Sequence, residues 1–121
     1  MSDLLHNRAP AQMLQAYAAA KAHRSLREQE ADVFRRTNAV IRYARGNGAV
    51  AEARALADNE RLWHAVGDLV RDPENALPAE LRATIASLAI AVCRESRALE
   101  PSWDFLLNVN ENMAAGLADK P

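Results

Sequence analysis

Residues 50–71 read VAEARALADNERLWHAVGDLVR, and this stretch decides the fold class. Its apolar positions recur at steps of three or four residues, as expected of a helix that turns one face to a core. The stripe contains Leu56, Asn59, Trp63, Val66 and Val70, and Leu62 and Leu69 widen it. The stretch therefore predicts an amphipathic helix over about residues 50–71.

Glycine and proline residues divide the rest of the chain into further helices. Gly46-Asn47-Gly48 ends a long helix that begins at the capping-box spacing of Ser25 and Glu28. Pro78 begins another helix, which Glu100-Pro101-Ser102 ends, and a last helix runs to about Gly116. We expect an arm over residues 1–12 and a short alanine-rich helix over about residues 10–22. The prediction is an all-α, single-domain antiparallel bundle over residues 1–121, with about four main helices plus the short N-terminal one.

Composition and charge narrow the class of protein. A chain of 121 residues has room for one domain, and 15 basic against 16 acidic residues argue against direct nucleic-acid binding. A long uncharged apolar stretch, Ala83 to Cys93, would span about 16 Å as a helix, too short for a hydrocarbon core of about 30 Å. We therefore expect no membrane span. The single cysteine and the lack of a secretory leader favour a cytoplasmic protein.

Residues capable of catalysis or metal binding are sparse. His6, His23, His64 and Cys93 lie far apart, and no two of them have the spacing that brings ligands onto one helix face. The chain has no glycine-rich phosphate loop and no nucleophile elbow. We expect no catalytic residues, no metal and no cofactor.

A basic strip crowds the second half of the long helix and has two interpretations. Its members are Arg35, Arg36, Arg42 and Arg45. A solvated helix face is the simpler interpretation, because Asp32 stands at pairing distance from the first two. A regulator that binds RNA through this strip is the alternative, and its binding would weaken steeply with salt.

Two asparagines occupy positions where a core side chain is expected. Asn59 and Asn110 each fall in an apolar stripe, and a buried amide without a partner costs roughly 1–3 kcal/mol. Each must bond across the bundle or to a bound chain. Trp63 belongs to the core stripe, whereas Trp103 and Phe105 begin a helix and can anchor a partner.

The helix that begins at Pro78 is apolar nearly all round. Leu81 and Ile85 lie on one face, and Ile90 lies on another. Such a helix is central to a bundle or has one side covered by a partner. The partner can be another protein, or a second copy of this chain in a homodimer.

Several segments, read in order, resemble the flagellar biosynthesis regulator FlaF family. They are Tyr17 in an alanine-rich helix, Arg27-Glu28-x-Glu30 leading to Phe34, residues 56–63 as LADNERLW, residues 72–83 as DPxNxLPxxLRA, residues 85–88, and residues 107–117 as LxVNxxMxxGL. The resemblance covers about Tyr17 to Leu117.

The resemblance implies a small cytoplasmic helical protein, without catalytic activity, that is needed for flagellin production and export. Its implied partners are flagellin and the FlbT-type regulator of flagellin messenger RNA, and contact with that messenger RNA is the alternative function. An apolar helix beside a bundle can offer a groove to an amphipathic partner helix. We place that groove along Leu81 to Val92 and the Trp103 helix start, and expect the arm with Leu4 and Leu5 to cover it when flagellin is absent.

The predicted functional residues form two groups. The partner-binding candidates are Leu81, Ile85, Ile90, Trp103, Phe105 and Asn110. The residues of the structural motif are Asn59, Leu62, Trp63, Asn75, Pro78 and Arg82.

Overall fold

In a computed structural model, the described residues of the chain form four helices. The structure describes the backbone of residues 2–119 and the side chains of that range except those of residues 2–9, 21, 23–26 and 119. The helices are α1 (Ser2–Ala44), α2 (Ala49–Arg71), α3 (Ala79–Ser96) and α4 (Trp103–Asp119), and no strand occurs in the described residues. The all-α bundle predicted from the sequence is confirmed.

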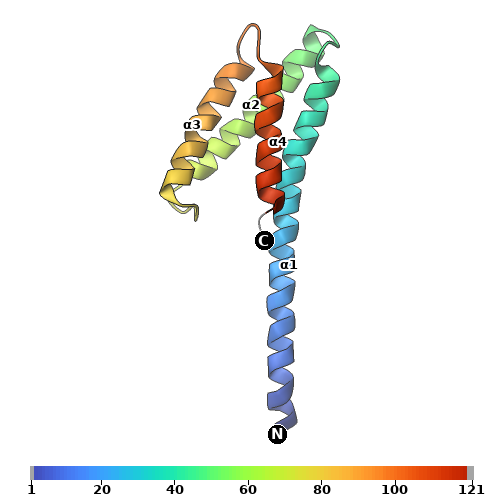
Figure 1. Cartoon of the computed structure of the whole chain (residues 1–121), viewed down its shortest axis with the longest axis vertical. Helices are drawn as coiled ribbons and strands as arrows, with labels where there is room; N and C mark the ends of the chain where they lie inside the picture. Colours follow the sequence, from blue (N-terminus) through green and yellow to red (C-terminus); the bar gives the residue numbers. More distant parts are fainter. Residues whose placement is uncertain (1, 120–121) are drawn as a thin grey trace.

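The helices pack as two antiparallel pairs, α1 with α4 and α2 with α3 (Figure 1). Contacts within each pair are extensive, whereas α3 and α4 barely touch. The turn between α1 and α2 contains Gly46 and Gly48, whose φ angles of 81° and 103° lie in the region that favours glycine. The sequence predicted this turn correctly, because its signal is local.

The N-terminal region differs from the prediction. The backbone of residues 2–44 is one continuous helix. Residues 2–12 therefore do not form a separate arm, and the prediction of a separate short helix over residues 10–22 was wrong. The reason is composition: the residues between Pro10 and Gly46 include no glycine or proline, and alanine, leucine and glutamine favour the helix. The spacing of Ser25 and Glu28 therefore falls inside a helix instead of starting one.

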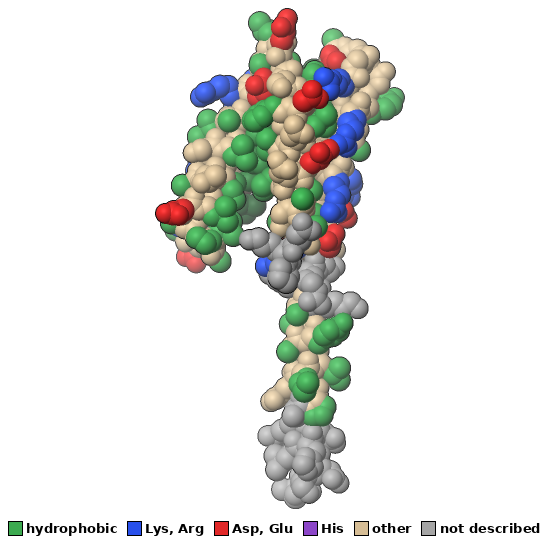
Figure 2. Space-filling view, in the orientation of Figure 1, with side chains coloured by type: hydrophobic (Ala, Val, Ile, Leu, Met, Phe, Trp, Pro, Cys, Tyr) green, Lys and Arg blue, Asp and Glu red, His purple; other side chains and the backbone are tan. Residues whose placement is uncertain are grey.

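The first half of α1 projects beyond the bundle (Figure 1). We call residues 10–20 the stalk. All of these residues are exposed, and Met13, Leu14 and Tyr17 have 71%, 69% and 63% of their surface open to solvent. Figure 2 shows apolar side chains along this segment.

The core of the bundle lies where the two helix pairs meet. Phe34 of α1 and Trp63 of α2 pack edge to face with ring centroids 5.8 Å apart. Around them lie further buried apolar residues of α1, α3 and α4. A second, smaller cluster of Ile41, Ala44 and Ala55 lies near the turn between α1 and α2. The main cluster joins the two pairs along the bundle, and the smaller cluster joins them at the end away from the stalk.

Buried amides join all four helices beside this core. We call Asn38, Asn59 and Asn110 the amide cluster; each is at most 1% exposed. The Asn110 Nδ2 donates to Asn38 Oδ1 at 3.0 Å and to Asn59 Oδ1 at 2.8 Å, and its Oδ1 accepts from Trp63 Nε1 at 2.7 Å. Asn59 Nδ2 donates to Ser96 Oγ of α3 at 3.2 Å. The partners of Asn59 and Asn110 thus lie across the bundle.

Candidate functional site

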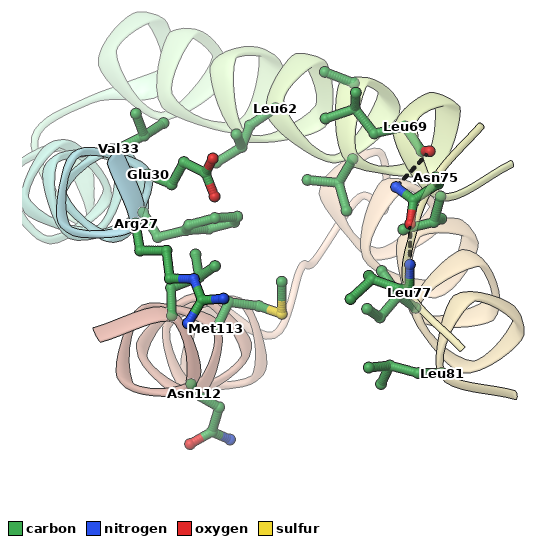
Figure 3. A pocket seen from close by; sticks show the side chains of 17 residues that line it. Arg27, Glu30, Val33, Leu62, Leu69, Asn75, Leu77, Leu81, Asn112 and Met113 are labelled. Carbon is green, nitrogen blue, oxygen red and sulfur yellow. Dashed lines mark hydrogen bonds between the residues drawn. The ribbon is translucent and has the colours of Figure 1, made fainter. Parts of the chain in front are cut away.

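An apolar groove lies at the stalk end of the bundle, where the two helix pairs diverge (Figure 3). Its volume is about 710 Å³. Each helix contributes the part nearest this end: the middle of α1, the end of α2, the start of α3 and the end of α4. The lining residues are Arg27, Glu30, Val33, Phe34, Leu62, Ala65, Val66, Leu69, Val70, Asn75, Leu77, Leu81, Ile85, Asn112, Met113, Gly116 and Leu117.

The walls of the groove are apolar and partly open to solvent. Leu69 on α2 is 64% exposed, and Leu77 and Leu81, on the same side of the groove, are 40% and 39% exposed (Figure 3). The charged residues among those lining the groove are Arg27 and Glu30, both on α1 (Figure 3). Large apolar side chains gathered in a concave surface are typical of a binding site, because burying them against a partner is favourable.

The loop between α2 and α3 holds one wall of the groove in place. Asn75 Nδ2 donates to the Leu69 carbonyl at 2.9 Å, and Asn75 Oδ1 accepts from the Leu77 N–H at 3.0 Å (Figure 3). Arg82 Nε donates to the Leu77 carbonyl at 3.1 Å. Pro78 precedes α3 with an extended ψ of 145°, so the chain turns there into the helix. These contacts fix the positions of Leu69 and Leu77, and thus the width of the groove on this side.

The predicted functional residues divide between the groove and other parts of the bundle. Leu81 and Ile85 line the groove, and so do Leu62 and Asn75 from the predicted structural motif. Ile90 is 51% exposed on α3 but lies outside the groove lining.

The other three partner-binding candidates lie elsewhere. Trp103 packs against the cluster of Ile41, Ala44 and Ala55, and Phe105 packs against the main core. Asn110 is fully buried in the amide cluster, so its side chain bonds to other helices of the chain and does not reach the surface.

Several groove residues were not predicted from the sequence. Leu69 and Leu77 of the α2 end and loop, and Met113 of α4, contribute much of its apolar surface. A signal for Leu69 was present, because Leu62 and Leu69 make the α2 stripe wider than one buried face requires. No comparable signal marks Met113, whose position depends on how far the helix pairs diverge.

The predicted covering arm does not lie over the groove. The backbone of residues 2–12 continues α1 away from the bundle (Figure 1). The side chains of Leu4 and Leu5 lie outside the described residues. The continuous helix explains the difference, since the backbone of residues 2–44 contains no turn at which the chain folds back.

The basic strip on α1 is neutralised by acidic partners. Arg35 Nη1 lies 2.8 Å from Asp32 Oδ1, and Arg45 Nη1 lies 2.9 Å from Asp104 Oδ1 of α4. Arg42 pairs with Glu111 of α4. Three of the four arginines therefore support the α1 surface and its seam with α4, which reduces the positive field available to a nucleic acid.

Reactive and metal-binding groups are scarce in the described residues. Burial raises the pKa of the Cys93 thiol, which favours its neutral, unreactive form. In the described part of the chain, no three histidine, cysteine or acidic side chains gather as a metal site requires. No described helix combines the length and the apolar character needed to cross a bilayer.

The fold and the site define a small helical bundle with a large apolar groove at one end. The family model of the flagellar protein FlaF matches residues 13–117 of this chain. The chain therefore belongs to the FlaF family and is a flagellar protein. No curated protein and no solved structure matches it.

Proposed function

We propose that the chain serves flagellum assembly as a binding protein, without catalysis, that holds an amphipathic helix of flagellin in the groove before export from the cytoplasm. The observation that carries this proposal is the groove itself, whose exposed leucines lie between four helices in a protein of a flagellar family. Flagellin is the export substrate that the family resemblance implies. Shielding its apolar helical face would prevent premature association.

The dimensions of the groove suit a helix. Its α2 wall runs from Leu62 to Val70, which is about 12 Å or a little over two helical turns. A partner helix would therefore place its apolar residues i, i+3 or i+4, and i+7 against this wall. Each leucine fully buried on binding contributes about 1.5–3 kcal/mol.

The test is a binding measurement with purified flagellin monomer. Chromatography coupled to light scattering, at low and high salt, would give the mass of any complex. We expect a complex that survives high salt, because apolar burial is not screened by ions. Leu69→Gln/Leu81→Gln should weaken binding by about tenfold or more, since two exposed groove leucines are lost.

A matched control removes equally large apolar side chains outside the groove. Ile90→Gln/Leu99→Gln changes two residues that are 51% and 102% exposed and do not line the groove. This variant should bind flagellin as the unchanged protein does. Equal loss of binding in both double variants, or no complex with the unchanged protein, would refute the proposed groove.

The same experiment addresses the alternative partners. A transcript bound through the basic strip would be lost between low and high salt. The FlbT-type regulator can be substituted for flagellin in the same mixture, and a complex with it alone would replace flagellin as the partner.

A further inference from the structure

Two apolar surfaces in the described part of the chain are open to solvent, and they lie at the same end of the bundle. One is the stalk, residues 10–20, and the other is the groove. We propose that the stalk of one copy occupies the groove of a second copy, in a two-fold symmetric dimer in which each copy gives one stalk and receives one.

The stalk has the properties of an interface helix. Its sequence, PAQMLQAYAAA, contains no charged residue, and every one of its residues is exposed. Helical segments without tertiary contacts are marginally stable in water, and most helical stability in proteins comes from packing an apolar face. Met13, Leu14 and Tyr17 supply the large side chains for such packing, and the alanines allow close approach.

The lengths of the two surfaces match. Eleven stalk residues span about 16 Å, and the α2 wall of the groove spans about 12 Å. The α1 residues that line the groove, Arg27 to Phe34, follow shortly after the segment that projects as the stalk (Figure 1). A second copy running antiparallel along α1 would thus bring its stalk directly to the opening.

The register of such a pairing follows from the sequence of α1. Met13, Tyr17 and Ala20 recur at steps of four and three, and continuing this pattern leads to Arg27, Ala31 and Phe34 at the groove and core. A two-fold axis beside residue 22 places Tyr17 of one copy opposite Arg27 of the other. The tyrosine ring would then lie beside a guanidinium group, a favourable pairing.

The contact area reaches the size of a stable interface. One face of the stalk offers on the order of 400 Å², with the tyrosine as its largest part. Two seated stalks and two receiving grooves supply four such surfaces, which together approach the roughly 1,600 Å² of a standard specific interface. A single stalk in a single groove would reach about half of that, so the symmetric arrangement is the one with enough area.

The dimer goes beyond the proposed flagellin binding and needs no flagellin. If the chain did not dimerise, the proposal that it binds flagellin would still stand. If it did not bind flagellin, the proposed dimer would still stand. Where both occur, stalk and flagellin helix compete for one groove, so excess flagellin would separate the dimer.

The mass of the purified full-length chain in solution tests the proposal. Light scattering and sedimentation from about 1 μM to about 100 μM cover the weak end of the affinities found for interfaces of this size. We expect the mass of two 13.3 kDa chains at the upper concentrations. Met13→Gln/Tyr17→Gln should weaken dimerisation at least tenfold, and so should Leu69→Gln/Leu81→Gln in the groove.

A matched control lies on the same helix. Val40→Gln/Tyr43→Gln also removes one aliphatic residue and one tyrosine from α1, at positions 48% and 76% exposed and outside the groove. This variant should dimerise as the unchanged chain does. A monomer at every concentration, or a dimer unaffected by the stalk variant, would overturn the proposal. Loss of the dimer only in the stalk variant would indicate that stalks pair with each other, and would also overturn it.

Cross-linking tests the contact directly. The single native cysteine, Cys93, is buried, so one new surface cysteine per variant is selective. Mixing Ala16→Cys, on the stalk, with Ala65→Cys, in the groove, should give a disulfide-linked pair of the two variants under mild oxidation. A mixture of Ala16→Cys with Tyr43→Cys should not, and equal yields in both mixtures would contradict the proposed seating.

Discussion

The two ends of the bundle are built from the same four helices but are joined by different chemistry. Beyond the groove, toward the end away from the stalk, the amide cluster links all four helices through side-chain hydrogen bonds of 2.7–3.2 Å. At the stalk end, α3 and α4 separate and leave apolar side chains facing a groove. One end is closed by directional bonds, and the other is lined by groups that attract any apolar surface.

This difference suggests that one end of the bundle maintains the fold and the other end binds a partner. Buried hydrogen bonds require particular distances and angles, so the amide cluster permits one arrangement of the helices. Apolar contacts are not directional, so the groove can accept side chains from another chain. Substitutions at the closed end should therefore change stability, and substitutions at the open end should change binding.

The largest effect is expected from Asn110→Ala, which breaks the closed end at its centre. The substitution leaves Trp63 Nε1 without its acceptor and the Asn38 and Asn59 oxygens without their donor. Because each buried unpaired group costs about 1–3 kcal/mol, we expect the free energy of unfolding to fall by about 3–5 kcal/mol. The free energy of unfolding can be measured by urea denaturation, with circular dichroism as the signal.

Asn112→Ala is the control for this prediction. Asn112 lies two residues away on α4, is exposed at the edge of the groove, and is not part of the amide cluster. Its substitution should change the free energy of unfolding by no more than about 0.5 kcal/mol. If Asn110→Ala cost no more than this control, the amide cluster would not hold the closed end together.

A smaller loss is expected from Ser96→Ala, at the edge of the same network. The serine Oγ accepts from Asn59 Nδ2 and donates to the Val92 carbonyl, so one amide donor loses its partner. We expect a loss of about 1–2 kcal/mol in the same denaturation experiment. A loss as large as that of Asn110→Ala would mean that the link to α3, and not the central amide, governs the closed end.

The open end should contribute little to stability. Leu69→Gln/Leu81→Gln replaces partly exposed leucines with a residue of similar helix propensity, so we expect the free energy of unfolding to fall by less than about 1 kcal/mol. Thermal denaturation of the same samples used for binding would measure it. A loss above about 2 kcal/mol would place these leucines in the folded core and remove the contrast between the ends.

The smallest effect is expected from Glu111→Gln, on the outside of the α1 and α4 pair. Glu111 and Arg42 are each about half exposed, 52% and 53% by side chain, so their ion pair is open to solvent. Such pairs contribute about 0–1 kcal/mol and less at high salt. We expect a change below about 0.5 kcal/mol that shrinks as salt is added to the denaturation series.

The sequence predicted the parts of the fold that depend on local signals. The turn at Gly46 and Gly48 and the ends of α2 and α3 near proline residues follow from backbone preferences of the residues present. The start of α1 was missed because a serine three residues before a glutamate is compatible with a helix interior as well as with its start. Whether such a serine and glutamate start a helix or lie inside one depends on the residues that precede them.

The candidate site was predicted in part, for a physical reason. Leu81 and Ile85 were recognised because α3 has more apolar surface than one buried face needs. Trp103, a predicted partner-binding residue, lies outside the groove and packs beside Ile41, because the start of α4 lies against the end of α1. Where an apolar side chain ends up depends on the angle between helix pairs, and no short segment encodes that angle.

The unbroken α1 has a hydrodynamic consequence. A helix of 43 residues is about 65 Å long, whereas a compact chain of this length has a radius of gyration of about 14 Å. Friction on the projecting segment would make a single chain elute from a gel-filtration column ahead of globular standards of equal mass. Elution volume alone would then report a dimer for a monomer, so the number of chains must come from scattering or sedimentation equilibrium.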